Sequence, residues 1–159
     1  MNLPSYIVTN AEHSNESVLK KIRHELQHCE EFYFFVAFIT NSGVTALQQT
    51  LELMLAKDVK GKILTSDYQY FTEPEALKKL NMYSNMETRM ICEKNMHSKG
   101  FFFKNKTNLN IMIGSSNWTA NALQSNIELN LFLETEKVSN LALSTLTEFH
   151  DHFNNADII

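Results

Sequence analysis

The chain has 159 residues, of which 43% are hydrophobic and 20% charged, and its formal net charge at pH 7 is −4. This length suits one domain with one core, and the composition excludes disordered and fibrous proteins. The acidic balance excludes a generally basic nucleic-acid coat protein but is compatible with a local basic groove. The sequence contains no apolar run of the roughly 20 residues that span a bilayer, and its polar start, residues 1–16, has no signal-peptide pattern. We therefore expect a cytoplasmic protein without a membrane partner.

Hydrophobic spacing predicts alternating helices and strands in the first half of the chain. A helix is expected over residues 14–29, because Val18, Ile22 and Leu26 recur at helical spacing. The continuous aromatic and β-branched run 32–39 is typical of a strand buried on both faces of a sheet. The segments that follow continue the alternation and are expected as helix 44–56, strand 59–65, helix 74–80 and strand 88–92.

The second half of the chain is richer in strands. The expected elements there are strands 97–103, 108–113 and 127–133, a short helix at 117–123 and a last helix at 138–153. Alternation of helices and strands favours a parallel sheet, whereas successive strands favour antiparallel pairs. We therefore predict one α/β domain over residues 1–159, with its core at about 14–153. Its central sheet is mostly parallel or mixed and has helices on both faces.

One motif matches a zinc-site pattern. Residues 24–28 fit the HExxH sequence of zinc-protease helices. His24 and His28 share a helix face, but that face lies away from the apolar stripe that should meet the core, and no third ligand is near. We expect both histidines to be solvated. Cys29 and Cys92 are far from any CxxC spacing, so they predict neither a zinc knuckle nor a disulfide framework. The sequence thus indicates no metal and no cofactor.

A second group of polar residues is more specific. It comprises residues 97–100, 113–119 and 126–128. His97 and Lys99 point to the same face of a strand, because side chains alternate with period two. An HxK match alone is expected by chance in roughly every second chain of this composition, and His97 alone fits a strand-edge surface residue. The two later segments make the pattern more specific than the HxK match alone.

These later segments supply hydrogen-bond donors at the end of one predicted strand and an acidic residue on the next. Ser115 and Asn117 can project from the carboxyl end of a strand that stops at the glycine before them. Capping of the following helix by Ser116 or Asn117 is an equally weighted alternative. Glu128 faces the same way as Asn130 on an otherwise apolar strand. A carboxylate buried there needs a partner such as histidine or lysine.

Together these residue types suit phosphoryl transfer. Lysine, asparagine and serine donate hydrogen bonds to phosphate oxygens, and a histidine beside them can act as nucleophile or general acid. Glu128 can orient an imidazole. The sequence has no aspartate cluster for magnesium and no GxxxxGK[ST] loop, which favours metal-free chemistry.

This pattern resembles the signature of the phospholipase D superfamily, HxK followed by GSxN, here at residues 97–99 and 114–117. Glu128, eleven residues after Asn117, is similar to the acid of its nuclease branch. The superfamily's usual aspartate, five residues after the lysine, is replaced by Lys104. That departure weakens the likeness to lipid-cleaving members. It matters less for restriction-nuclease and helicase-associated members.

The similarity extends beyond the motif. Residues 34–43, 59–68 and 71–77 resemble phospholipase D-like modules fused to DEAD/DEAH-type helicases. Taken together, the likeness covers about residues 14–153. It implies either a stand-alone protein or the N-terminal module of a longer helicase chain, with a helicase domain as a possible partner.

The resemblance implies a mechanism. His97 attacks phosphorus and forms a phosphohistidine, and a second histidine protonates the leaving oxygen. Lys99 and Asn117 hold the non-bridging oxygens with help from Ser115, while Glu128 orients its histidine. Because the chain has a single HxK, a two-fold homodimer that brings two His97 residues to one site is expected.

Three functions compete. The first is a DNA phosphodiester hydrolase, with Lys104, Lys106, Ser116 and Trp118 as further substrate contacts. Basic residues gather in sequence around the motif, although such a run also fits a solvated surface. The second is a non-catalytic DNA-binding module that targets a helicase, favoured by lysine in place of the aspartate. Phospholipid cleavage is a third, weaker reading, since no interfacial helix with a basic face is evident.

Overall fold

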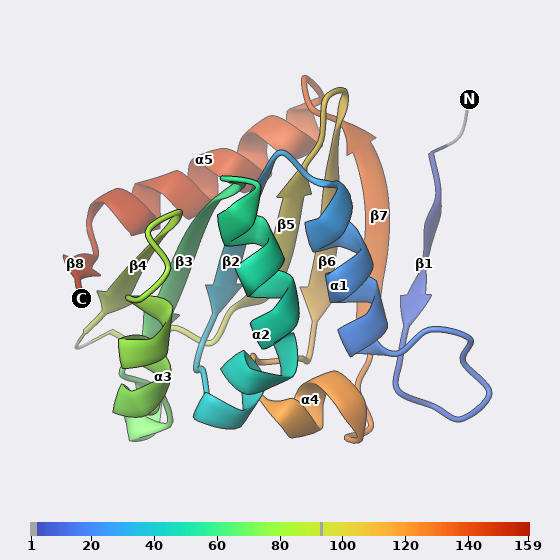
Figure 1. Cartoon of the computed structure of the whole chain (residues 1–159). Helices are drawn as coiled ribbons and strands as arrows, with labels where there is room; N and C mark the ends of the chain where they lie inside the picture. Colours follow the sequence, from blue (N-terminus) through green and yellow to red (C-terminus); the bar gives the residue numbers. More distant parts are fainter. Residues whose placement is uncertain (1–2, 93) are drawn as a thin grey trace.

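A computed structural model describes residues 3–92 and 94–159 of the chain. The strands of this part are β1 (Ser5–Val8), β2 (Glu31–Val36), β3 (Lys60–Ser66), β4 (Met86–Ile91), β5 (Lys99–Lys104), β6 (Asn108–Gly114), β7 (Asn130–Glu136) and β8 (Asp157–Ile158). The helices are α1 (Val18–His28), α2 (Asn41–Ala56), α3 (Pro74–Leu80), α4 (Ala120–Gln124) and α5 (Asn140–Asn154), with a single 3-10 turn, η1 (Tyr68–Tyr70). Figure 1 shows their arrangement.

The strands of the described part form one eight-stranded mixed sheet in the order β1-β7-β6-β5-β2-β3-β4-β8. β2, β3 and β4 pair in parallel, and β5, β6 and β7 continue the sheet in antiparallel pairs. The connections follow this split, because α2 and α3 carry the chain back between the parallel strands, whereas a short turn at residues 105–107 joins the antiparallel strands β5 and β6. β6 and β7, which are also antiparallel, are joined by a longer connection that contains α4. The α/β fold with a mixed sheet is thus confirmed.

Helices cover both faces of the sheet. In Figure 1, α1 to α4 lie in front of the strands and α5 crosses behind them. On the α1–α4 side, Phe34 packs edge-on against Trp118 with ring centroids 5.1 Å apart. On the α5 side, Tyr33 packs against Phe149 at 5.4 Å. Adjacent β2 residues therefore enter opposite cores, which explains the unbroken hydrophobic run of this strand.

Helix starts follow the sequence closely. The hydroxyl groups at four N-caps accept a hydrogen bond from the backbone N–H three residues later, and these caps are Ser17, Thr40, Thr119 and Ser139. Pro74 opens α3, where its missing N–H costs nothing. Within the described residues, no helix combines the length and apolar character needed to cross a membrane.

The structure differs from the sequence prediction at several strand ends. The edge strands β1 and β8 were not expected, and β8 has only two residues. β2 stops at Val36 rather than at residue 39, and β7 begins at Asn130 rather than at residue 127. Both differences lie at the same edge, where side-chain contacts replace strand pairing.

That edge collects the motif residues. The carboxyl ends of β2, β3 and β6 meet the amino ends of β5 and β7 there, because β2 and β3 run in the same direction whereas β5, β6 and β7 reverse direction from one strand to the next. It is the lower end of the sheet in Figure 1, and we call it the site edge. The fold thus gathers residues that are far apart in the sequence.

Candidate functional site

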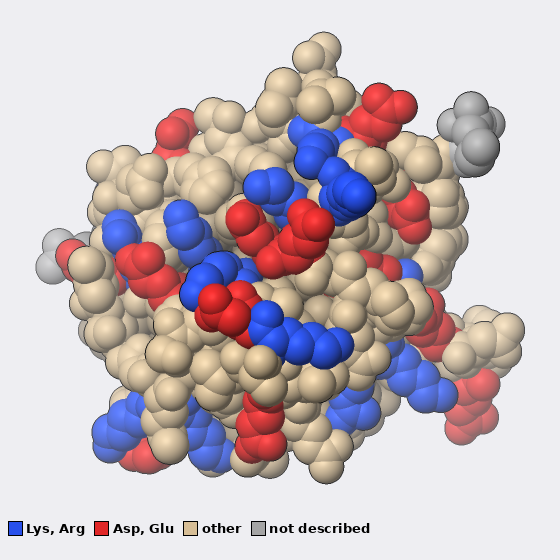
Figure 2. Space-filling view, turned by 45° about the horizontal axis from the view of Figure 1, so that its top comes forward, with Lys and Arg blue, Asp and Glu red and all other residues tan. Residues whose placement is uncertain are grey.

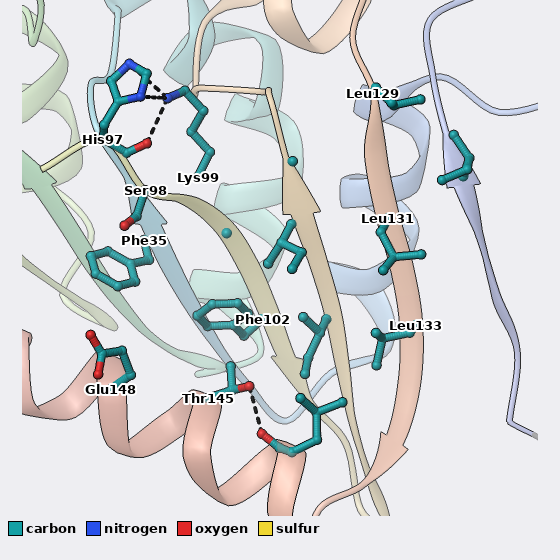
Figure 3. A pocket seen from close by; sticks show the side chains of 16 residues that line it. Phe35, His97, Ser98, Lys99, Phe102, Leu129, Leu131, Leu133, Thr145 and Glu148 are labelled. Atoms are coloured by element: carbon teal, nitrogen blue, oxygen red, sulfur yellow. Dashed lines mark hydrogen bonds between the residues drawn. The ribbon is translucent and has the colours of Figure 1, made fainter.

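His97 and Lys99 lie together at the start of β5. The Lys99 Nζ atom is 3.2 Å from Nδ1 and 3.3 Å from Nε2 of His97, and it donates a hydrogen bond to the His97 backbone oxygen at 2.9 Å. Figure 3 shows this contact at one end of a groove. His97 precedes β5 and is exposed, whereas Lys99 is half-buried. The two side chains meet as the period-two argument predicts, although only Lys99 belongs to the strand.

The surroundings of Lys99 affect its charge. Burial lowers the pKa of its ammonium group below the ordinary lysine value, and the negative charge of Glu128 partly opposes that shift. The two groups therefore lie within electrostatic reach of each other. A lysine in this setting holds an anion with a charge that is less fully hydrated than at an open surface.

Ser115 joins the end of β6 to the loop before β7. Its hydroxyl donates a hydrogen bond to the Glu128 carboxylate and accepts one from the Leu129 backbone N–H at 3.0 Å. The residue before it must be glycine, because a Cβ at Gly114 would lie 2.3 Å from the Leu129 backbone oxygen. This close approach holds Ser115 and Glu128 side by side.

Ser116 and Asn117 are buried residues, and neither caps the following helix. The Ser116 hydroxyl donates to the Glu128 carboxylate at 3.1 Å. The Oδ1 atom of Asn117 accepts the Phe38 backbone N–H at 3.2 Å. Thr119 is the N-cap of α4, so the capping alternative for Ser116 and Asn117 is wrong. In the described part of the chain the Asn117 Nδ2 group has no hydrogen-bond partner, so its two N–H bonds are available to a ligand.

Two positioning residues were missed by the sequence argument. Asn130 is 2% exposed; its Oδ1 accepts the Ser116 backbone N–H at 3.3 Å and its Nδ2 donates to the Ser116 hydroxyl at 3.0 Å. The Tyr68 ring packs against the His97 ring with centroids 5.3 Å apart. The only signal for Asn130 was its shared face with Glu128. Nothing in the sequence pattern indicated Tyr68.

Glu128 contacts different partners from those expected. Its hydrogen bonds, as far as the described residues show, run to Ser115 and Ser116 and not to His97. The residue lies in the loop before β7 rather than in the strand, because the Ser115 and Ser116 hydroxyl groups draw its carboxylate toward the end of β6. This geometry therefore does not support the expected role of Glu128 in orienting the histidine of the same chain.

Of three expected substrate contacts, two lie away from this group and the third has its side chain buried in the core. Lys104 ends β5 at the far side of the sheet, about 17 Å from Lys99 for a six-residue strand, and its Nζ lies 3.3 Å from a Glu31 carboxylate oxygen. Lys106 follows in the turn beyond it. Trp118 is fully buried, and its Nε1 donates to the Gly43 backbone oxygen at 2.8 Å. Proximity in sequence was misleading for all three.

The charges at that far end are mixed. Figure 2 brings the upper end of Figure 1 forward and shows basic and acidic side chains interleaved on this face. Lys60 pairs there with Asp58, and Lys104 with Glu31. The basic run around the motif therefore does not form one basic patch, because an extended strand carries its two ends to opposite edges of the sheet.

The HExxH segment faces solvent. His24 and His28 are exposed, and their rings lie 4.4 Å apart on the surface of α1. Glu25 points inward, where it pairs with Lys21 at 2.8 Å and accepts a hydrogen bond from Asn110 at 2.7 Å. Among residues 3–92 and 94–159, no three histidine, cysteine or acidic side chains are grouped to hold a metal ion.

An apolar groove of about 740 Å³ runs from the His97–Lys99 pair along the α5 side of the sheet. In β-register, Ile7, Leu131 and Ile113 form one row across β1, β7 and β6, and the row continues to Gly100 on β5. All three side chains of this row are at least 38% exposed. Figure 3 shows Leu129 and Leu131 on the same wall and Glu148 of α5 opposite. The groove therefore joins exposed apolar surface directly to the motif.

The site thus combines an exposed imidazole with groups that can donate hydrogen bonds to an anion. Lys99 supplies a cation and Asn117 an amide, while Glu128 accepts hydrogen bonds from both serines of the loop before Asn117. Donors of this kind hold phosphate oxygens, and an imidazole beside them can attack phosphorus or move a proton.

Comparison with known proteins shows the family of the chain. A family model described as cardiolipin synthase, PLD-like domain, matches residues 22–155. The chain belongs to this PLD-like family. The match covers nearly all helices and strands of the PLD-like chain, including the HxK and GSxN segments. No curated protein sequence matches the chain significantly.

Solved structures share the PLD-like fold. NucT from Helicobacter pylori superposes with a TM-score of 0.77 at 14% identity, covering 99% of each chain. Nuc from Salmonella typhimurium, described as a phospholipase D family member, gives 0.73 at 16% identity over 99% of this chain and 98% of that one. A phosphatidylserine synthase from Haemophilus influenzae gives 0.69 at 12% identity, over 99% of this chain and 40% of its own.

Proposed function

We propose that this PLD-like chain hydrolyses phosphodiesters of DNA without a metal ion, with His97 as the nucleophile. The observation that carries the proposal is the contact of the Lys99 ammonium group with the imidazole of His97, at 3.2 and 3.3 Å from its two nitrogens. A phosphate held by Lys99 would present phosphorus to that ring. The likeness to NucT and Nuc over whole chains supports the same reading of the fold.

The reaction consists of two successive displacements at phosphorus. An imidazole nitrogen of His97 forms a bond to phosphorus while the bond to the leaving oxygen breaks, and a second histidine gives that oxygen its proton. Water then attacks the phosphohistidine, loses a proton to the second histidine and releases His97. Lys99 and the Asn117 amide stabilise the charge on the non-bridging oxygens, and Ser115 and Glu128 fix the loop that carries Asn117.

The second histidine is proposed to come from a second copy of the chain. Only His97 is followed two residues later by lysine. Beside it lies the exposed row formed by Ile7, Leu131 and Ile113, and monomeric proteins rarely leave a large apolar patch uncovered. A two-fold axis along this groove would bury the row against itself and bring two His97 residues to one site.

The decisive test is hydrolysis in the presence of a chelator. The purified protein should cleave DNA and bis(p-nitrophenyl) phosphate in EDTA, and His97→Ala should abolish both activities. His24→Ala removes an exposed histidine from α1 and serves as the matched control, with full activity expected. Full activity in His97→Ala, or complete loss of wild-type activity in EDTA, would contradict the proposal.

A non-catalytic module that binds DNA for an associated helicase is the second candidate. It is favoured by Lys104 at the position of the superfamily's usual aspartate, where it pairs with Glu31 instead. This alternative expects DNA binding that weakens steeply with salt but no turnover. Cleavage by the isolated chain would exclude it, and salt-sensitive binding without cleavage would select it.

A further inference from the structure

A short aromatic segment borders the site and has no role in the chemistry above. It comprises Tyr68, Tyr70 and Phe71, in and just after η1 between β3 and α3. Tyr70 is 90% exposed and Phe71 50% exposed. Exposing two large rings at neighbouring positions of a loop is costly in water, so the segment suits a partner that covers them.

The backbone holds this segment in a fixed and unusual conformation. Gln69 and Tyr70 have φ angles of 48° and 58°, a left-handed conformation that residues with a side chain seldom adopt. The Tyr70 N–H donates to the Asp67 backbone oxygen at 2.8 Å, and the buried Thr72 hydroxyl donates to the Ser66 backbone oxygen at 2.8 Å. The rings are therefore presented from a turn fastened at both ends, and such strain concentrates at ligand-binding sites.

One end of the segment contacts His97, and the other contacts a residue hydrogen-bonded to Asn117. The Tyr68 ring lies 5.3 Å from the His97 ring. The Phe71 ring lies 5.3 Å from that of Phe38, whose backbone N–H donates to Asn117. Tyr70 lies between these two anchors in the chain. The backbone of Tyr70 is thus held between two residues that pack at the site edge.

The aromatic segment and the apolar groove flank the site on opposite sides. The segment follows β3, while the groove is lined by residues of β5, β6 and β7, and β2 separates β3 from β5 in the sheet. A second copy of the chain seated in the groove therefore leaves the segment open to another partner.

We propose that Tyr70 and Phe71 form a stacking platform for unpaired bases next to the scissile phosphate, so that the substrate is a single-stranded polynucleotide. This inference rests on the proposed phosphodiesterase for the position of the phosphate. Aromatic rings stack on any base, because every base has a flat π-face, but bases within a duplex already stack on one another. The paired interior of a duplex would gain little from the platform.

The charges beside the segment disfavour a lipid surface as the partner. Asp67 precedes it and Glu73 follows it, whereas aromatic segments that enter anionic membranes are usually accompanied by basic side chains. The same carboxylates repel the phosphates of a polynucleotide, so the contact with the rings is made by the uncharged base faces. A polynucleotide whose phosphate is held by Lys99 can thus place its next base over the rings.

The experiment measures binding separately from cleavage. Fluorescence anisotropy in the His97→Ala background compares labelled oligothymidylate, an abasic oligonucleotide of equal length, and a duplex. Tyr70→Ala should weaken binding to oligothymidylate about tenfold, the effect of one lost base stack, and Tyr70→Trp should preserve it. Binding of the abasic strand should be the same in all variants. Tyr70→Gly, which suits the left-handed backbone, should behave as Tyr70→Ala and guards against misfolding.

Met82→Ala is the matched control, because Met82 is 80% exposed but lies in the loop before β4, at the edge opposite the site. It should leave oligothymidylate binding unchanged. Equal losses for the abasic strand, or no loss in Tyr70→Ala, would overturn the platform. Loss of binding to phosphatidylglycerol vesicles with unchanged oligothymidylate binding would assign the segment to a lipid surface instead. Absence of cleavage in the wild type would refute the phosphodiesterase but leave this readout intact.

Discussion

Individual side chains set the charge of the site, and Lys99 is the most informative of them. Burial lowers the pKa of Lys99 below the ordinary value of 10.5, so its ammonium group loses its proton at a lower pH than an exposed lysine would. Because the charged form binds phosphate, kcat/KM should fall as pH rises through this lowered pKa.

Two variants test the cause of that alkaline limb. Glu128→Gln removes the charge that opposes the shift, so the limb of the remaining activity should move to lower pH. Lys99→Arg keeps its charge at all accessible pH values and should move the limb to higher pH. The measurement is kcat/KM for bis(p-nitrophenyl) phosphate from neutral to alkaline pH. A limb that stays in place in both variants would show that Lys99 does not titrate in catalysis.

Ser115 has a more modest expected effect. Ser115→Ala removes the hydrogen bonds to Glu128 and to the Leu129 N–H, and we expect about 10- to 100-fold lower kcat, the size of one charge-assisted hydrogen bond. Ser144→Ala, an exposed serine on α5, should have no effect. Circular dichroism checks that both variants fold. A wild-type kcat for Ser115→Ala would show that Ser115 has no role in the site.

The two cysteines should differ in reactivity. Burial raises the pKa of the Cys29 thiol to about 12, so almost no thiolate forms near neutral pH. Cys92 is exposed. Iodoacetamide followed by mass spectrometry should label Cys92 well before Cys29. Equal labelling of the two in the folded protein would contradict the burial of Cys29.

What the sequence could predict about single residues depended on spacing. His97, Lys99, Ser115 and Asn117 were predicted as site residues because a short motif fixes their spacing relative to two strand ends. Trp118 was misassigned because its burial depends on contacts with a helix 75 residues away in the sequence. No local pattern reports such a contact.

Helices and strands were predictable in number and type through the middle of the chain. Their ends at the site edge were not, because tertiary hydrogen bonds decide them. The Ser115 hydroxyl accepts a hydrogen bond from the Leu129 N–H, and the Asn117 side chain accepts one from the Phe38 N–H. Strand pairing would otherwise continue at these positions. β1 was missed because four residues on a sheet edge are too short for a periodic signal.

The start of α2 is packed against the motif loop, and this contact can be tested. A Cβ at Gly43 would lie 2.2 Å from the Trp118 backbone oxygen. Gly43→Ala should therefore force α2 and this loop apart, lowering the free energy of unfolding by about 1–3 kcal/mol. Because Asn117 is adjacent, activity should fall as well. Chemical denaturation and reporter hydrolysis measure the two effects. An unchanged unfolding midpoint would show that the two elements are not in close contact.

The whole molecule is proposed to work as a pair. Leu131→Glu places a charge in the middle of the exposed apolar row and should convert a dimer to monomers with loss of hydrolysis. Leu143→Glu changes an exposed leucine on α5 that does not line the groove, and it should remain dimeric and active. Sedimentation velocity gives the mass of each variant. A wild-type monomer with full activity would refute the shared site.

The fold class of the whole molecule was predictable, but the distribution of its charge was not. The net charge of −4 and the run of lysines around His97 suggested a basic site on an acidic protein. The sheet instead carries Lys104 to its far end, where acidic and basic groups interleave (Figure 2). Of Lys99 and Lys104, only Lys99 lies at the site edge, because the extended strand β5 carries the two residues to opposite ends of the sheet.

The central claim is that His97 becomes covalently bound to phosphorus. Mass spectrometry of protein quenched during turnover of a slow phosphodiester in EDTA tests this most directly. We expect a phosphorylated species on the peptide that contains His97, which is lost on acid treatment and absent in His97→Ala. Turnover with no adduct on that peptide, or an adduct that persists in His97→Ala, would contradict it.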